Sequence, residues 1–127
     1  SIKQMSDVIE LCGDDFAVLS GDDLFTLPLL AMGGAGIISV ISNVAPADMA
    51  GLVDAFAAKD FAKAKALHHK MSPLIESLFI EVNPTPVKAA LALMGKIQYE
   101  FRLPLCKMSD ANLEKLRKVM VNYGLIK

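Results

Sequence analysis

The residues best suited to chemistry follow a short apolar run near the start of the chain. Two carboxylates and a glycine come directly after Phe16–Ser20, in the stretch Ser20-Gly21-Asp22-Asp23. In α/β folds, ligands bind at the carboxyl ends of parallel strands, and glycine lets the backbone approach a ligand closely. A plain turn followed by a helix N-cap explains the same residues, so both interpretations stay open. Two adjacent acids repel phosphate, which favours a ligand without phosphate.

Two other motifs predict structure rather than a site. The glycines of Gly33-Gly34-Ala35-Gly36 precede an apolar run, whereas the dinucleotide-binding fingerprint follows a strand and opens a helix. They therefore predict the end of a helix. His68 and His69 are adjacent on a predicted helix, so their side chains diverge by about 100°. Metal-binding pairs on helices have i, i+4 spacing, and we expect no metal site.

The elements that must position these residues alternate at first and are then helical only. Apolar runs without alternation predict buried strands at Phe16–Ser20 and Gly36–Ile41. Periodic apolar residues, with caps and glycine stops, predict helices over residues 2–12, 24–32, 46–58, 61–79, 86–94 and 110–123. Residues 96–108 are expected to be irregular.

The order strand–helix–strand predicts a right-handed crossover and a parallel pair of strands, and so an α/β fold. Two strands do not make a stable sheet alone, so further strands must be supplied from elsewhere.

Composition excludes several classes of protein. The chain has 127 residues, 54% of them hydrophobic and 21% charged, which argues against a disordered chain. Its 13 basic and 14 acidic residues give a net charge of −1, which argues against nucleic-acid binding. The uncharged run from Leu24 to Ala47 contains prolines and glycines, so we expect no membrane span. Two distant cysteines and no evident signal peptide predict a cytoplasmic location.

Five motifs, in order along the chain, are similar to the C-terminal part of the dihydrodipicolinate synthase family. Each is weak alone, but together they cover essentially the whole chain, and they are Leu19-Ser20-Gly21-Asp22-Asp23, Gly33-Gly34-Ala35-Gly36-Ile37-Ile38-Ser39-Val40, Asn43-Val44-Ala45-Pro46, Asn83-Pro84-Thr85-Pro86-Val87-Lys88 and Arg102-Leu103-Pro104-Leu105. The resemblance implies the last two strands of a (β/α)8 TIM barrel with their helices (residues 1–58), followed by a C-terminal helical appendage (residues 59–127). A whole barrel needs about 250 residues.

The same resemblance implies a pyruvate-dependent class I aldolase, a lyase without a cofactor. In this family pyruvate forms a Schiff base with a lysine, and the derived enamine attacks aspartate β-semialdehyde on the route to diaminopimelate and lysine. The implied protein is a cytoplasmic homotetramer, so expected partners are a second copy of the protein and the N-terminal half of the barrel.

Residue by residue, the carry-over is short. Gly21 resembles the glycine beside the family's substrate pocket, with Asp22 next to it, and Ile38 resembles the residue whose backbone carbonyl faces the pyruvate adduct. No catalytic residue is carried over, because the Schiff-base lysine of the family lies at the end of strand six, upstream of Ser1. Lys3 does not replace it, since it lies within a predicted helix and faces solvent, where a protonated amine is a poor nucleophile.

Two alternatives remain beside the synthase. One is another pyruvate-dependent aldolase, such as N-acetylneuraminate lyase or a keto-deoxy-sugar aldolase. The other is a catalytically silent half-barrel that serves as an assembly unit. Gly21-Asp22-Asp23 and Ile38-Ser39-Val40 favour the synthase over the lyases.

Overall fold

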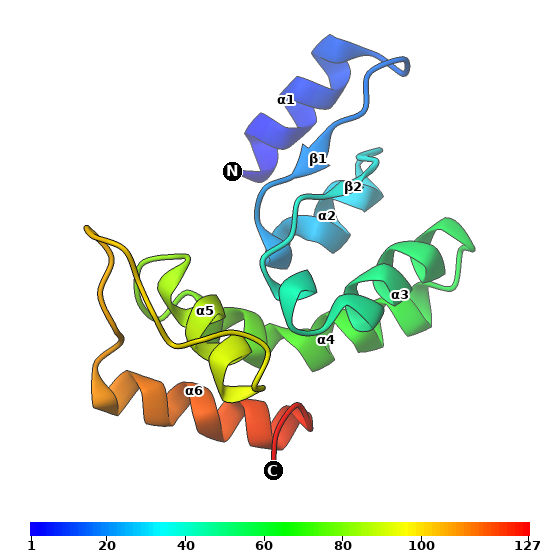
Figure 1. Ribbon diagram of the computed structural model, residues 1–127. Helices are drawn as coiled ribbons and strands as arrows, with labels where there is room; N and C mark the ends of the chain where they lie inside the picture. Colours follow the sequence, from blue (N-terminus) through cyan, green and yellow to red (C-terminus); the bar gives the residue numbers. More distant parts are fainter.

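The computed structural model describes residues 1–127 as six α-helices and one parallel two-stranded sheet (Figure 1). Along the chain, the elements are α1 (Ile2–Cys12), β1 (Leu19–Ser20), the 3₁₀ helix η1 (Asp23–Phe25), α2 (Thr26–Ala31), β2 (Gly36–Ile37), the 3₁₀ helix η2 (Ile41–Asn43), α3 (Pro46–Ala57), α4 (Phe61–Leu78), α5 (Thr85–Leu93) and α6 (Asp110–Tyr123). The predicted α/β order, strand–helix–strand followed by helices only, is confirmed.

The helix boundaries follow from local caps. Ser109 accepts a hydrogen bond from the Asn112 N–H at the start of α6, and Asp60 does the same for Lys63 at the start of α4. Gly124 ends α6 in the left-handed conformation, with φ of 89°, which glycine adopts without a Cβ penalty.

The prediction of one helix from Leu24 to Met32 is wrong at its start. The segment begins as η1, and α2 starts only at Thr26. Pro28 is the third residue of α2, where its missing N–H breaks no intrahelical bond, so it does not kink the helix.

The strands are shorter than predicted. The pairing joins Leu19 to Gly36 and Ser20 to Ile37, instead of extending over Phe16–Ser20 and Gly36–Ile41. Each strand has a partner on one side only, so no further ladder keeps the flanking residues extended. The predicted burial on both faces is also absent in this chain, because Phe16, Leu19 and Ile38 are 61%, 46% and 71% exposed.

Gly34 brings α2 and β2 close together. Its N–H donates to the Leu29 carbonyl at 2.9 Å, and a Cβ on Gly34 would clash with the Leu29 side chain. The helix can therefore end directly under the strand only because this position has no side chain.

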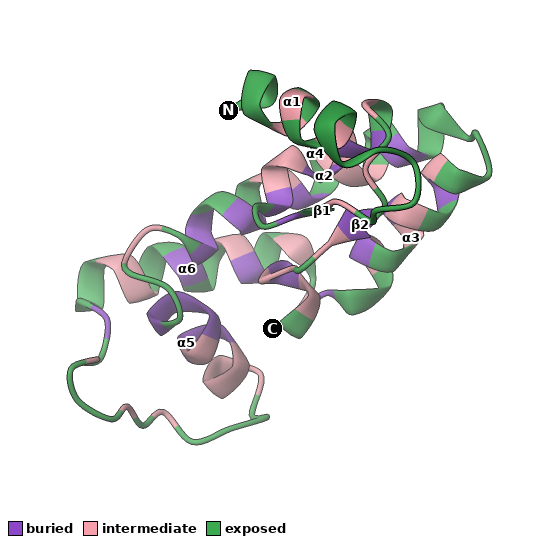
Figure 2. Cartoon of the chain, turned by 90° about the horizontal axis from the view of Figure 1, so that it is seen from above, coloured by how far each residue is buried: buried purple, intermediate pink, exposed green.

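One hydrophobic core extends from α2 and η2 through the helices α3 to α6 (Figure 2). Its 16 residues are Leu30, Ile41, Val44, Ala45, Met49, Leu52, Met71, Leu74, Ile75, Leu78, Val87, Ala89, Ala90, Met108, Leu116 and Met120. No residue of α1 is buried. None of the six α-helices combines the length and the apolar character that a membrane-spanning helix needs.

Candidate functional site

The predicted site residues meet at the carboxyl ends of the two parallel strands. Gly21 and Asp22 follow β1 directly, and Ile38 follows β2. The Ile38 N–H donates to the Ser20 carbonyl at 2.9 Å, which continues the ladder beyond the strands and sets the two segments side by side (Figure 1). Residues that are 17 positions apart in sequence therefore share one edge of the sheet, where α/β folds bind ligands.

The turn after β1 is held by its own polar groups. The Ser20 hydroxyl donates to the Asp22 carbonyl at 2.7 Å and accepts from the Asp22 N–H at 3.2 Å. The Asp22 carboxylate accepts from the Leu24 N–H at 2.9 Å and caps η1. The turn-plus-cap interpretation is thus correct for Asp22, which is exposed.

Gly21 leaves open space at this turn. A Cβ built on it would meet nothing within 4 Å, so nothing within this chain requires glycine there. The residue is exposed and lies between the buried Ser20 and the capped turn. The space beside it is available to a ligand or to a further part of the protein.

Asp23 is a buried carboxylate that the sequence analysis interpreted only as a cap. It is 2% exposed, and its Oδ2 accepts from the Val40 N–H at 3.1 Å and the Ile41 N–H at 3.0 Å. Its Oδ1 is buried and has no hydrogen-bond partner within the chain. The only signal in the sequence was the second acid of the turn, because one aspartate is sufficient to cap η1 and two are adjacent there.

The Ile38 carbonyl is free to accept a hydrogen bond. No N–H of the chain donates to it. By contrast, the Ser20 carbonyl accepts from the Ile38 N–H, and the Val40 carbonyl accepts from Asn43. Asp23 fixes the backbone just after it, through the Val40 and Ile41 N–H groups. A fixed, unpaired carbonyl at a strand end can orient a ligand hydroxyl.

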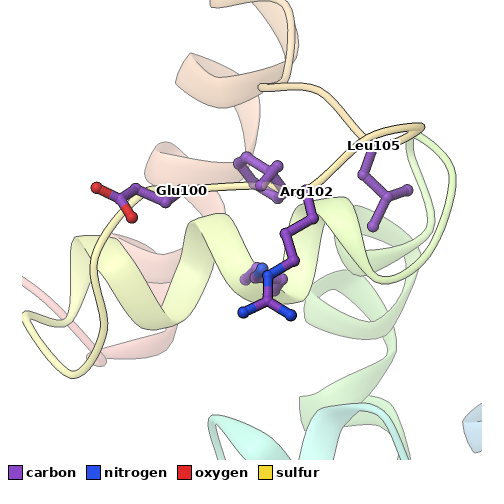
Figure 3. A pocket seen from close by; sticks show the side chains of 5 residues that line it. Glu100, Arg102 and Leu105 are labelled. Atoms are coloured by element: carbon purple, nitrogen blue, oxygen red, sulfur yellow. The ribbon is translucent and has the colours of Figure 1, made fainter.

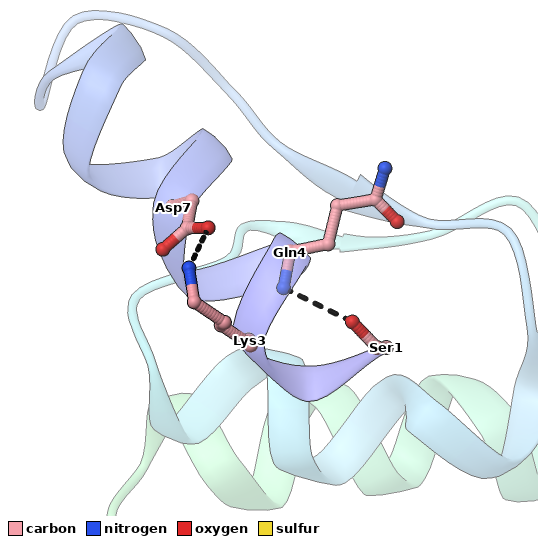
Figure 4. A network of polar contacts seen from close by, with 4 residues as sticks. All are labelled: Ser1, Lys3, Gln4 and Asp7. Atoms are coloured by element: carbon pink, nitrogen blue, oxygen red, sulfur yellow. Dashed lines mark hydrogen bonds and ion pairs between the residues drawn. The ribbon is translucent and has the colours of Figure 1, made fainter.

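No lysine stands at these strand ends. Lys3 lies in the first turn of α1, where its side chain is 84% exposed and pairs with Asp7 at 2.6 Å (Figure 4). In the same turn the Ser1 hydroxyl accepts from the Gln4 N–H. An exposed, ion-paired ammonium is protonated and has no lone pair for attack on a carbonyl.

The other titratable motifs lie away from this edge. His68 and His69 have ring centroids 5.3 Å apart, and burial, with the charge of His69, lowers the pKa of His68. No group of three or more His, Cys, Asp or Glu side chains is arranged to hold a metal ion.

The hydroxyl of Tyr123 donates to Asp48, whose Oδ2 also accepts from Lys70 at 2.7 Å. Tyr99 accepts from the Met108 N–H at 3.1 Å. Tyr123 therefore links α6 to α3, and Tyr99 links the two ends of the segment between α5 and α6.

Both faces of the small sheet are incompletely covered. A hollow of about 570 Å³ runs along β2 and is lined by residues that include Leu19, Gly36 and Ile37. A second hollow, of about 230 Å³, separates β1 from α1. Parallel strands are normally buried on both faces, so this pair is typical of a larger parallel sheet.

A parallel strand–helix–strand unit with candidate ligand-binding residues at the strand ends places the chain among the α/β barrel or doubly wound proteins. Comparisons with known proteins define the class. The chain belongs to the dihydrodipicolinate synthetase family, whose model matches residues 1–122. Solved structures of this family are TIM barrels, which accounts for the two parallel strands and their uncovered faces.

The relatives match nearly the whole chain, while the chain spans less than half the length of each relative. It is 69% identical over 126 residues to the 4-hydroxy-tetrahydrodipicolinate synthase of Syntrophus aciditrophicus and 56% identical to that of Thermodesulfovibrio yellowstonii; this is 99% of the chain and 43% of each relative. The dihydrodipicolinate synthase structure from Aquifex aeolicus matches 98% of the chain with a TM-score of 0.96 and 43% identity, and 43% of that structure is covered. The dihydrodipicolinate synthase structure from Thermotoga maritima matches 99% of the chain with a TM-score of 0.94 and 43% identity, and 44% of that structure is covered.

Proposed function

We propose that this chain is the C-terminal part of a 4-hydroxy-tetrahydrodipicolinate synthase, which condenses pyruvate with aspartate β-semialdehyde. The observation that carries the proposal is the hydrogen bond from the Ile38 N–H to the Ser20 carbonyl, which sets Ile38 beside the Ser20-Gly21 turn at the carboxyl ends of two parallel strands, in a chain 69% identical to an enzyme of that name. The open hollows beside the two strands support the proposal that the remaining strands of a barrel pack against them in the intact protein.

Within this proposal, the residues of the chain bind and orient the substrate. The unpaired Ile38 carbonyl accepts a hydrogen bond from a hydroxyl of the pyruvate adduct. Gly21 leaves room for the adduct, and the exposed Asp22 stands next to it in the turn. The carboxylates of Asp22 and Asp23 disfavour a phosphorylated substrate at this edge.

The amine that forms the Schiff base belongs, in this proposal, to a lysine outside residues 1–127. Such an amine needs to be neutral and held in a desolvated pocket. No lysine of the chain stands at the strand ends, and Lys3 is solvated and paired with Asp7. The enamine derived from the adduct then attacks the aldehyde carbon of aspartate β-semialdehyde.

The remaining expectations belong to the same proposal. Residues 1–58 complete the barrel and residues 59–127 form its helical appendage, with α3 and α4 packed across the division. The intact protein acts in the cytoplasm as a homotetramer in diaminopimelate and lysine biosynthesis, and it uses no metal or cofactor.

Trapping with pyruvate and borohydride, followed by mass spectrometry, tests the proposal. The 127-residue chain alone should acquire no adduct. With the N-terminal part of a close family relative added, an adduct should form on a lysine of that added part, and aspartate β-semialdehyde should be consumed.

Three outcomes would contradict it. A stoichiometric adduct on Lys3, or on another lysine of this chain, would place the nucleophile here. Cleavage of N-acetylneuraminate instead of condensation would identify a different aldolase of the superfamily. No adduct on the assembled protein would identify a catalytically silent unit.

A further inference from the structure

A further hollow, of about 520 Å³, lies between α5 and the irregular segment that follows it, and this groove is lined by Lys88, Glu100, Phe101, Arg102 and Leu105. Its size is in the range of small-molecule sites. Arg102 extends its guanidinium into the space below the segment, whereas the Glu100 carboxylate points away along it (Figure 3). The groove thus presents two cationic groups, with the one acid of the lining turned aside.

Neither cation of the groove is neutralised within the chain. Lys88 and Arg102 have no carboxylate within 4.0 Å, although the chain has 14 acidic residues. The Lys88 ammonium instead lies 4.8 Å from the centroid of the Phe101 ring. A cation held over an aromatic face keeps its charge and is available to a further anion.

The segment that carries Arg102 is tied down at several points. The Met108 N–H donates to the Tyr99 hydroxyl at 3.1 Å, and the Leu105 N–H donates to the Arg102 carbonyl at 3.0 Å. The rings of Tyr99 and Phe101 pack edge to face, with centroids 5.3 Å apart. These contacts fix the shape of the segment, and the contact between Lys88 and the Phe101 ring joins it to α5.

The groove lies on the carboxyl-end side of the strands. α5 contacts η2, which follows the end of β2, and both α5 and the segment after it lie on the side toward which the strand arrows point (Figure 1). A ligand approaching the strand ends from this side therefore passes the field of Lys88 and Arg102. A cleft that is lined by charges of one sign and has low-dielectric walls raises the local concentration of counter-ions in this way.

We propose that Lys88 and Arg102 form a carboxylate-capture site that binds pyruvate before it reaches the strand ends. The inference rests on the proposed function, because it takes pyruvate as the anion. Arg102 supplies a planar fork that matches a carboxylate, and Lys88 supplies a point charge beside it. Both charges assist binding without contacting the reacting carbonyl.

The test uses the intact protein with single variants at the groove. Arg102→Gln and Lys88→Gln should each lower kcat/KM for pyruvate about 3- to 10-fold at low ionic strength, and added salt should largely remove the difference. The kcat at saturating pyruvate should stay within about twofold, because only the capture step is weakened.

Lys107→Gln is the matched control. It removes one positive charge from the same segment, at an exposed side chain that lies over the Tyr99 ring instead of lining the groove. It should leave kcat/KM and its salt dependence unchanged. Thermal unfolding of all three variants checks folding separately.

The outcomes separate this inference from the function on which it rests. If the wild-type protein forms no borohydride-trapped pyruvate adduct, the proposed function fails. If it does form the adduct, and Arg102→Gln and Lys88→Gln keep the wild-type kcat/KM at low salt, the capture site is wrong. A loss that salt does not reduce, or an equal loss with Lys107→Gln, also overturns it.

Discussion

The carboxylate of Asp23 accepts a hydrogen bond from the backbone N–H of Ile41 at 3.0 Å, across 18 positions of sequence. The same oxygen accepts from the Val40 N–H. Asp23 comes after β1, and the two N–H groups come after β2, so one buried side chain ties together the ends of both strands. The position of the Ile38 carbonyl therefore depends on a residue that does not touch it.

Replacing Asp23 should lower the free energy of unfolding. Asp23→Ala leaves two N–H groups without an acceptor, and we expect the free energy of unfolding to fall by about 2–4 kcal/mol. Asp23→Asn keeps an acceptor oxygen and should lose less. Asp22→Ala removes only an exposed cap and should cost about 1 kcal/mol. Urea unfolding of the intact protein measures all three, and equal losses at both positions would contradict the special role of Asp23.

Enlarging Gly21 should separate folding from binding. The open space around it accepts a methyl group, so Gly21→Ala should shift the free energy of unfolding by less than about 0.5 kcal/mol. The KM for pyruvate should rise severalfold, because the methyl group enters the proposed pocket. Gly51→Ala, in α3, adds the same group away from the strand ends and should leave KM unchanged. An unchanged KM in Gly21→Ala would remove Gly21 from the site.

Glu81 should make the helical part sensitive to acid. Its Oε1 accepts from Asn112 Nδ2, and from the Ser109 N–H and hydroxyl; the Asn112 bond is the main cause that lowers the pKa of Glu81 below its ordinary 4.5. A carboxylate with a lowered pKa stabilises the fold above pH 4.5, and that contribution is lost as pH falls below it. Urea midpoints at pH 7 and pH 3.5 should therefore differ less in Glu81→Gln than in the wild type. An equal difference would show that the bonds contribute nothing.

Tyr123 should make the fold sensitive to high pH. Burial is the largest cause that raises the pKa of its hydroxyl above 10, and the hydrogen bond and charge of Asp48 raise it further. A raised pKa means that the stabilisation is complete below pH 10 and is lost as pH rises above it. Tyr123→Phe should cost about 1–2 kcal/mol at pH 8 and less at pH 11. Unfolding midpoints at the two pH values test this, and a cost that grows with pH would refute it.

The strands should be protected from hydrogen exchange only by the rest of a barrel. The amides of Leu19, Ser20 and Ile37 lie in a sheet of only two short strands with open hollows beside it, so they should exchange rapidly in the 127-residue chain. Adding the N-terminal part of a family relative should slow them by orders of magnitude. Slow exchange in a compact monomer of the chain alone would contradict the half-barrel interpretation.

Sequence reasoning predicted the helices well because their signals are local. A serine or aspartate at the start and a glycine at the end act within one turn, as Ser109 and Gly124 do for α6. It overestimated both strands, since the length of a strand depends on neighbours that the chain does not provide.

The site could be predicted only in part. Gly21 and Ile38 follow neighbouring parallel strands, which the bond from the Ile38 N–H to the Ser20 carbonyl joins, and their roles remain predictions. Asp23 was missed because a long-range acceptor and a local cap have the same residue type. Lys88 and Arg102 were overlooked as a pair, since only the packing of the segment on α5 brings them to one groove.

The lack of any buried residue in α1 determines where the chain is vulnerable. Residues 13–17, which join α1 to β1, are exposed throughout, and the core begins only at Leu30. A protease has access to this connection without disturbing the packing of α3 to α6. Cleavage there would release α1 and leave a folded remnant, so limited digestion should produce one early, discrete product before the core is degraded.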